Sequence, residues 1–576
     1  MLLSCGVEDP TGSGRGGAAE SVQLLEPVEQ LLRISMSLRG ERPSLSEIAL
    51  VRDDPGQLDV LVDAWLQSDA FGRQIRDLHA QDFLTRTDTL EQLPSRGPIK
   101  DDNTWRVHTS VPEAPMRLVE WVVMSDLPYT EIVQTEVMIA DRITAEVNGL
   151  AWDSSDPTEW QETSWEDGRP KAGLLSSSQL WRRHRSAGSN FHRLRADFIA
   201  DTFLCEPFSE RDIVVEGGID LSDELAVADA VMTNEACVGC HQALDPLAAH
   251  FWGFRNQLKN RAVRLAYEDD CRWDPESEIV RGQGHSVEDN CYPLRFYYPI
   301  KEHEWQDWEL RPPSFYGQPS DRMDSLGAQI TSDQRFAECT ARRFWGWFAQ
   351  EPKEEVDDVL AFQLAEDFKR SGYDAKELVR QIVTHERFLA EETESPDWEP
   401  VGLLQVRPEQ LDSVLTQLMD FTWWASPSSE DCDPTCWGLV NLLRSDLYGY
   451  RVMMGGIDSI QVTSPTHTPI PTLPLVLERA ASEAAGVTVE ADFGLPAAQR
   501  RLLSLVEDTT VDEPTVRAQL VELHARILTE PLGVTDPEID RSFALWTGVY
   551  ELTRDPVRAW ELTIATLLQD PRMLFY

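Results

Sequence analysis

The chain has 576 residues, of which 41% are hydrophobic and 19 are tryptophan, so it is long enough for several globular domains and too apolar to be disordered. Acidic residues outnumber basic ones by 99 to 52, which gives a formal net charge of −47. Binding to nucleic acid or to anionic lipid requires a basic surface, and the net charge of this chain argues against one. The acid excess is spread along the chain, which favours a solvated surface over a dedicated basic partner. No apolar run approaches the length of a membrane-spanning helix.

Residues 1–20 are typical of a lipoprotein tether. Leu2-Leu-Ser-Cys5 is similar to a bacterial lipobox, in which Cys5 would carry the lipid, and the Gly-rich residues after it would be flexible. Only three residues precede Ser4, so the interpretation requires a signal peptide that begins further upstream. The alternative is a stray N-terminal cysteine. With lipidation, the chain would reach a membrane only through this anchor.

Helical periodicity predicts a mainly α, multi-domain protein. Residues 21–95 form an N-terminal helical domain, in which Ser44 and Glu47 make a capping box. A polar linker over 96–103 precedes a helical segment over 115–200. Residues 326–395 and a C-terminal domain over 401–576 are again helical.

Three segments show the same order of features: residues 32–71, 341–388 and 525–575. Each has an apolar helix, a Gly/Pro turn, an acidic helix start and a long helix that closes on an aromatic residue. We therefore predict repeated helical hairpins around an irregular, loop-rich segment over 201–325. The alternative is a generic helical periodicity.

The irregular segment contains Cys237, Cys240 and His241 in the pattern C-x-x-C-H, the attachment signature of a c-type haem. The two thiols would form thioethers with the vinyl groups of one porphyrin, and His241 would be the proximal iron ligand. The motif occurs once, which predicts one covalent haem c. There are three alternatives. A zinc half-site would need a second ligand pair at close spacing, a thioredoxin-like redox pair would need a βαβ context, and a structural disulfide would not explain the histidine.

The flanks of this motif carry a family resemblance. Residues 236–247 resemble the C-x-x-C-H-x-x-[ILV]-D-P-L box of cytochrome c-like proteins of planctomycetes and myxobacteria, which contain the domains of unknown function 1592, 1588 and 1585. Residues 115–200, 201–325 and 326–395 are similar to these three domains in that order. The box normally continues differently from His250-Phe-Trp-Gly-Phe254, so the outer contacts of the haem would differ here. The family has no settled activity, and the resemblance implies an architecture and a haem.

The other cysteines predict disulfides and an oxidising compartment. Cys271 and Cys291 share one loop-rich segment, Cys432 and Cys436 would close a tight ring, and Cys205 is then left for Cys339. Six cysteines allow 15 connectivities, and these pairings are one of them. Together with the haem motif and the lipobox, they predict an extracytoplasmic location in the periplasm or at the cell surface.

The sequence does not determine which residue is the distal ligand of the iron. His250 follows His241 by nine residues, which is about 14 Å along the axis of one helix and too far to share its iron, and Pro246 is expected to interrupt that helix. We favour Met323, with His285 and His303 as alternatives and an open sixth position as a further one.

Three functions follow from these predictions. The first is electron transfer to a redox partner protein by a mono-haem c-type lipoprotein. The second is a haem-assisted oxidoreductase that acts on an extracellular, carbohydrate-type substrate. The third is a surface binding or scaffold protein with a structural haem. Because the chain has no P-loop, dinucleotide fingerprint, H-E-x-x-H or G-x-S-x-G motif and no catalytic residues emerge, we favour the electron carrier over an enzyme. The sequence leaves the oligomeric state open.

Overall fold

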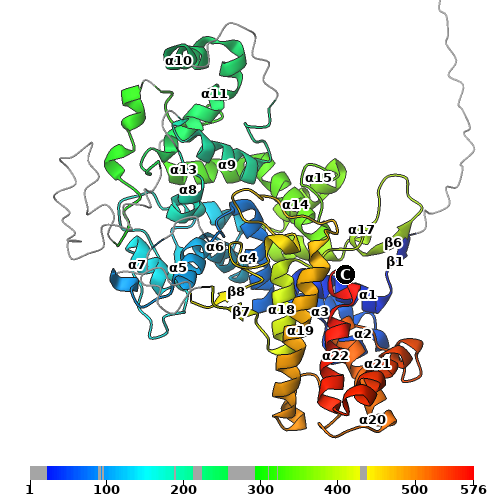
Figure 1. Ribbon diagram of the computed structural model, residues 1–576. Coiled ribbons are helices and arrows are strands. Elements are labelled where there is room, and N and C mark those ends of the chain that lie inside the picture. The colour runs from blue at the N-terminus through cyan, green and yellow to red at the C-terminus, as the bar shows by residue number, and fades with distance from the viewer. Residues whose placement is uncertain are drawn as a thin grey trace, which may run out of the picture.

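The structure is a computed structural model that describes residues 22–88, 93, 97–186, 190–211, 223–256, 292–308, 310–320, 322–427 and 438–576. It is 57% helical and 5% strand, which confirms the mainly α, multi-domain fold (Figure 1). The helices of the N-terminal half are α1 Pro27–Arg39, α2 Leu45–Asp53, α3 Gln57–Trp65, α4 Asp69–Phe83, α5 Thr104–Ser110, α6 Ala114–Met124, α7 Arg142–Asn148, α8 Ser178–Arg183, α9 Arg193–Leu204, α10 Glu224–Thr233 and α11 Glu235–Ala248.

The remaining described elements are the helices of the C-terminal half and eight very short strands. The helices are α13 Met323–Ser332, α14 Gln334–Ala349, α15 Asp358–Arg370, α16 Ala375–Val383, α17 Glu386–Leu389, α18 Pro408–Met419, α19 Thr472–Phe493, α20 Glu513–Leu523, α21 Pro537–Thr553 and α22 Pro556–Leu568. The strands form four antiparallel pairs: β1 Val22–Leu24 with β6 Ala390–Thr393, β2 Met138–Ala140 with β3 Gln161–Thr163, β4 Ser314–Phe315 with β5 Gln318–Pro319, and β7 Trp424–Ala425 with β8 Val440–Asn441.

Local sequence explains the helix ends. The capping box of Ser44 and Glu47 is present at the start of α2, where the Ser44 hydroxyl accepts a hydrogen bond from the Glu47 backbone N–H. Gly40 ends α1 in the left-handed conformation, with φ of 64°, which glycine adopts without strain. The turn after α1 is therefore encoded in the sequence itself.

The predicted helical hairpins are three-helix units instead. The helix after each turn was expected to be long, but it is broken into two: α2 and α3, α15 and α16, and α21 and α22. The breaks fall at Pro55-Gly56, at Gly372 with φ of 78°, and at Asp555-Pro556. These residues end or begin helices for conformational reasons, and the periodicity of the apolar residues runs across them without a visible gap.

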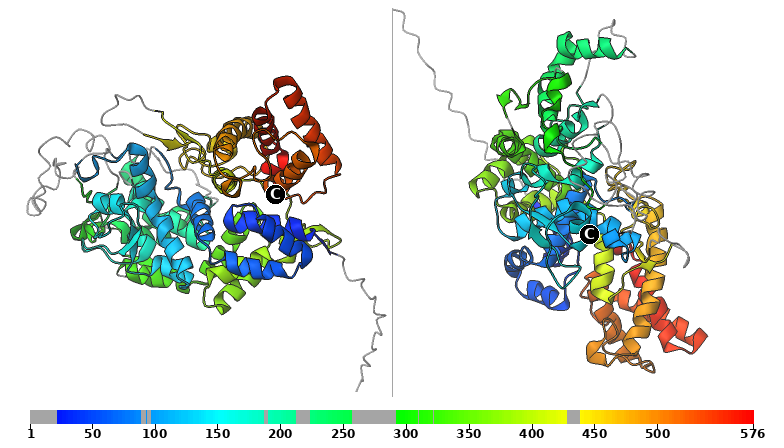
Figure 2. Two further views of the ribbon diagram at one scale, coloured as in Figure 1. Left: turned by 90° about the horizontal axis from the view of Figure 1, so that it is seen from below. Right: turned by 90° about the vertical axis from the view of Figure 1, so that its left-hand side faces the viewer.

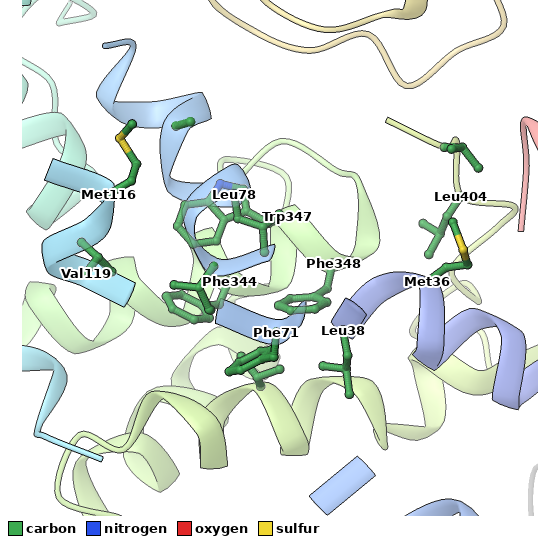
Figure 3. Packing of buried hydrophobic residues seen from close by; sticks show 14 of the residues in the cluster. Met36, Leu38, Phe71, Leu78, Met116, Val119, Phe344, Trp347, Phe348 and Leu404 are labelled. Atoms are coloured by element: carbon green, nitrogen blue, oxygen red, sulfur yellow. The ribbon is translucent and has the colours of Figure 1, made fainter. Parts of the chain in front are cut away.

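One apolar core passes through most of the described helices, from Leu31 in α1 to Tyr576 at the C-terminus, and a second small cluster includes Val107 of α5 and Ile143 of α7. Side chains of α1, α4, α6 and α14 meet in its middle, where Phe71, Phe344 and Phe348 lie side by side (Figure 3). Arg33 adds a polar link, because its guanidinium donates to the backbone carbonyls of Phe388 and Val401 at 2.8 and 2.9 Å. Helices from the N-terminal, middle and C-terminal parts of the chain therefore contribute to this core.

Residues 390–406 form a linker between α17 and α18, and both ends of the described chain contact it. Strand β1 pairs with β6 at the beginning of this linker. At the other end of the linker, Leu404 and Tyr576 exchange two backbone hydrogen bonds of 2.8 and 2.9 Å, and the Val406 N–H donates to the Leu574 carbonyl. The linker is thus fixed to both ends of the described chain.

Helices α10 and α11 lie at one end of the molecule, and α20 to α22 lie at the other (Figures 1 and 2). Helix α11 packs along α9, and α9 in turn packs on α14. The haem motif is therefore held on the body of the protein by α9 but lies at its periphery.

A buried carboxyl pair connects the N-terminal and C-terminal parts. The Asp88 Oδ2 accepts hydrogen bonds from the Ser445 hydroxyl at 2.5 Å and from the backbone N–H groups of Asp446 and Leu447 at 3.1 Å each. Burial, together with the charge of Asp446, raises the pKa of Asp88 to about 7. Asp88 is therefore protonated in much of the folded protein at neutral pH.

We expect Asp88→Asn to flatten the pH dependence of stability. The pKa of Asp88 in the folded protein lies above its ordinary value of 3.8, so the folded state holds this proton more tightly than the unfolded state does. The stability that this difference contributes is fully present below about pH 4 and is lost as the pH rises through 7. The wild-type protein should lose up to ~1.4 kcal/mol per pH unit over this range from this one group, and the amide variant should not. Urea unfolding at pH 5 and pH 8 measures the difference. Asp53→Asn, on an exposed side chain, is the control and should keep the wild-type slope.

Candidate functional site

The C-x-x-C-H motif lies within a helix and not in a loop as expected. Asn234 caps α11, since its side-chain oxygen accepts a hydrogen bond from the Ala236 N–H at 3.0 Å, and Glu235 places a negative charge in the first turn. Pro246 does not end the helix, because α11 continues through it to Ala248. A proline deprives the helix of one hydrogen bond, but the buried second half of α11 offsets that loss by packing on α9.

The helical conformation brings the three motif residues to one face. Cys237 lies three residues before Cys240 and four before His241, the spacings that make neighbours on a helix surface. All three side chains are half-buried, and neither cysteine is in a disulfide. Gly239, between them, faces open space, where an added Cβ would meet no atom within 4 Å. The two thiols themselves are partly exposed.

The imidazole of His241 is fixed by the next turn of the same helix. Its Nδ1 lies 2.9 Å from the Oδ1 of Asp245, four residues further on, and the Asp245 side chain is 4% exposed. Among the residues that the structure describes, none hydrogen-bonds the Nε2 of His241. A carboxylate at Nδ1 fixes the tautomer of a histidine and directs its Nε2 outward as a ligand.

Two arginines complete the surroundings of Asp245. The Nε of Arg193, at the first position of α9, donates to Asp245 Oδ1 at 2.7 Å. Arg311 lies with Nη1 3.5 Å from Asp245 Oδ2 and donates to the His241 carbonyl at 3.0 Å. Burial alone would raise the pKa of Asp245, but the hydrogen bonds from His241 and Arg193 hold it below its ordinary value. Asp245 is therefore a carboxylate that accepts from both.

These donors fit a covalently attached haem. Two thiols that are not paired with each other are available for thioethers, and an imidazole on the same helix face has one nitrogen held and the other without a described partner. Within the described ranges, no three His, Cys, Asp or Glu side chains gather closely enough to hold a metal ion. The haem signature does not need such a gathering, because its thiols bind the porphyrin and not the iron.

The other predicted site residues have different outcomes. Cys205, at the end of α9, and Cys339, in α14, form a disulfide with a Cα–Cα distance of 5.3 Å, the pair expected by elimination. Met323 begins α13 and is 2% exposed in the apolar core, a packing role that needs no iron, so its function as distal ligand stays a prediction. His303 is exposed. The remaining predicted residues lie outside the described part of the chain: Cys5, Cys271, His285, Cys291, Cys432 and Cys436.

Sequence reasoning missed the roles of Asp245, Arg193 and Arg311. Asp245 could have been found, because a histidine followed four residues later by an aspartate makes a pair once the segment is known to be helical. The arginines lie 52 residues before Asp245 and 66 residues after it, and nothing local in the sequence connects them to Asp245.

No family model, no curated protein and no solved structure matches this chain. The family resemblance rests on the residues quoted above. Within the described residues, no helix combines the length and the apolar character that crossing a bilayer requires.

Proposed function

We propose that the protein is a mono-haem c-type cytochrome-like protein that transfers electrons outside the cytoplasm. The observation that carries this proposal is the arrangement on α11, where two half-buried thiols outside any disulfide and an imidazole oriented by Asp245 share one face. When bound, the haem would supply one-electron oxidation and reduction.

Each residue of the site has a defined part in this proposal. Cys237 and Cys240 would bind the porphyrin through thioethers, and His241 would ligate the iron through Nε2. Asp245 accepts a hydrogen bond from the His241 Nδ1–H and fixes the imidazole plane, while hydrogen bonds from His241 and Arg193 hold the pKa of this carboxyl below its ordinary value. No described residue is needed as an acid, base or nucleophile.

The position of the site and the charge of the chain support a protein partner. Helix α11 lies at one end of the molecule, where a haem edge would be close to solvent and to a docked redox protein. The net charge of −47 favours a solvated surface, and it would also speed association with a redox protein that docks through basic residues. The Cys205–Cys339 disulfide supports an oxidising compartment. A lipid at Cys5 would hold the protein at a membrane.

The test is production in a bacterial periplasm that contains the haem-attachment machinery, followed by the alkaline pyridine spectrum. We expect one covalent haem per chain in the wild type, and none in Cys237→Ala with Cys240→Ala. Val238→Ala changes the spacer but neither thiol, and should keep the haem. The spectrum of the reduced protein then separates a six-coordinate carrier from an open, catalytic iron.

A chain that folds under these conditions without covalent haem would overturn the proposal. Cys237 and Cys240 would then be a redox or disulfide pair. A covalent haem that binds carbon monoxide rapidly in its reduced state would retain the cofactor but favour the oxidoreductase over the electron carrier.

A further inference from the structure

A second site lies away from α11, in a cleft of about 380 Å³. Helices α4, α5 and α6 form one part of it, and the segments around α18 and residues 444–451 form the other. Its volume is within the range of small-molecule sites. We call it the arginine cleft, after the residues that line it: Arg76, Arg86, Arg106, Arg117, Arg444 and Arg451.

The lining of this cleft is richer in arginine than the acidic chain as a whole. Its six arginines face four carboxyl groups, those of Asp88, Glu113, Asp141 and Glu409, in a chain with a net charge of −47. A long-range field of that size repels small anions, so a local cationic cleft is needed wherever the protein binds one.

Three of the arginines already have strong partners within the protein. Arg86 lies 2.6 Å from Glu113 and 2.5 Å from Asp77. Arg76 lies 3.2 Å from Glu113, and Arg444 lies 2.6 Å from Asp412. These buried pairs hold α4, α6 and α18 together and are structural.

Arg106 and Arg117 retain donors for a ligand. Arg106 donates one hydrogen bond, to the Pro157 carbonyl at 3.1 Å, and its nearest carboxylate oxygen is 3.9 Å away on Asp102. Arg117 donates from Nη1 to Glu120, and its side chain is 25% exposed. Arg451 is instead 4% exposed and already engaged, since it donates to the carbonyls of Arg444 and Arg86 and lies 3.7 Å from Asp446. A guanidinium has five donors, and such forks match the two oxygens of a carboxylate or the oxygens of a phosphate.

The remaining walls suit a ring with hydroxyl groups. Trp105 and Trp160 line the cleft, and the guanidinium of Arg117 lies 4.9 Å above the Trp160 ring. The hydroxyl oxygens of Thr109 and Thr158 lie in the same lining and are able to accept hydrogen bonds. Aromatic faces pack against the apolar faces of sugar rings, and the threonine oxygens give their hydroxyls partners.

We propose that the arginine cleft binds a small organic oxyanion, a monosaccharide-sized molecule with one carboxylate or phosphate group. Arg106 and Arg117 hold the anionic group, and Trp105 and Trp160 contact the body of the ligand. The proposal does not depend on a haem at α11, because no residue of that site lines the cleft.

The experiment is a calorimetric titration of the full chain with glucuronate, glucose 6-phosphate and neutral glucose, at a salt concentration of about 0.15 M to screen the net charge. We expect binding of one or both anions and none of glucose, and the stronger anion identifies the acidic group. Arg106→Gln with Arg117→Gln should weaken binding about tenfold or more, since each removes a charge-assisted hydrogen bond. Arg106→Lys keeps the charge without the planar fork and should recover part of the loss only.

Arg541→Gln with Arg558→Gln is the matched control, with the same change of charge on side chains that are 66% and 53% exposed and outside the cleft. It should bind the anions as the wild type does. Arg106 and Arg117 are both partly exposed, so we expect the double variant to unfold at the wild-type temperature in the absence of ligand. Three results would overturn the proposal: no heat from either anion at millimolar concentration, equal binding of glucose, or an equal loss in the control variant.

Discussion

Asp245→Ala is expected to destabilise the folded protein by ~3–5 kcal/mol. The carboxylate of Asp245 is the common partner of Arg193, His241 and Arg311, and its removal leaves two largely buried arginine charges without that partner. Asp245→Asn keeps the shape and one acceptor oxygen and should cost less. Urea unfolding gives the total loss, and hydrogen exchange of the α11 amides shows whether the loss is local.

Glu235→Gln is the control for this prediction, since it changes the same charge on an exposed side chain of the same helix. It should alter stability by only a few tenths of a kcal/mol. In the chain that carries the proposed haem, Asp245→Asn should also raise the reduction potential, because an imidazole that donates to a neutral amide is a weaker electron donor to iron. Unchanged stability and unchanged hydrogen exchange of the α11 amides in Asp245→Ala would contradict the predicted role of Asp245 in stability. An unchanged reduction potential in Asp245→Asn would contradict its predicted effect on the haem.

Removal of the Cys205–Cys339 disulfide, by Cys205→Ser with Cys339→Ala, is expected to lower the free energy of unfolding by ~2–5 kcal/mol. The two cysteines are 134 residues apart, so the bond excludes a large set of open conformations from the unfolded chain. Alanine suits position 339 because that side chain is 1% exposed.

Peptide mapping of the unreduced protein checks that this is the bond that forms. A digest in which Cys205 is joined to another cysteine would contradict the structure. If the double variant were as stable as the wild type under oxidising conditions, the disulfide would have no role in holding the segment between α9 and α14.

Much of the fold was predictable because it depends on neighbours in the sequence. The capping box at Ser44 and the apolar periodicity of α1, α14 and α18 need only local information, and these helices occur as expected. The disulfide was reached by elimination among cysteines. The breaks at Pro55-Gly56 and Asp555-Pro556 were visible in the sequence, but the apolar periodicity across them hid the division into two helices.

The residues of the C-x-x-C-H motif could be predicted from the sequence, but the side chains that surround them could not. Cys237, Cys240 and His241 form a compact motif, whereas the conformation of that motif depends on packing of α11 against α9, which no local pattern reveals. Arg193 and Arg311 meet at Asp245 only in the folded chain. The arginine cleft was missed for the same reason, since Arg106 and Arg451 are 345 residues apart in a sequence dominated by acidic residues.

The linker over 390–406 has a mechanical consequence. A force applied through residue 22 first loads the Val22–Thr393 end of the β1–β6 pair and opens its bonds one after another. A force applied through Tyr576 instead loads its paired hydrogen bonds with Leu404. Tension from either end is therefore borne first by contacts to one short stretch of chain, before it strains α11 or the arginine cleft.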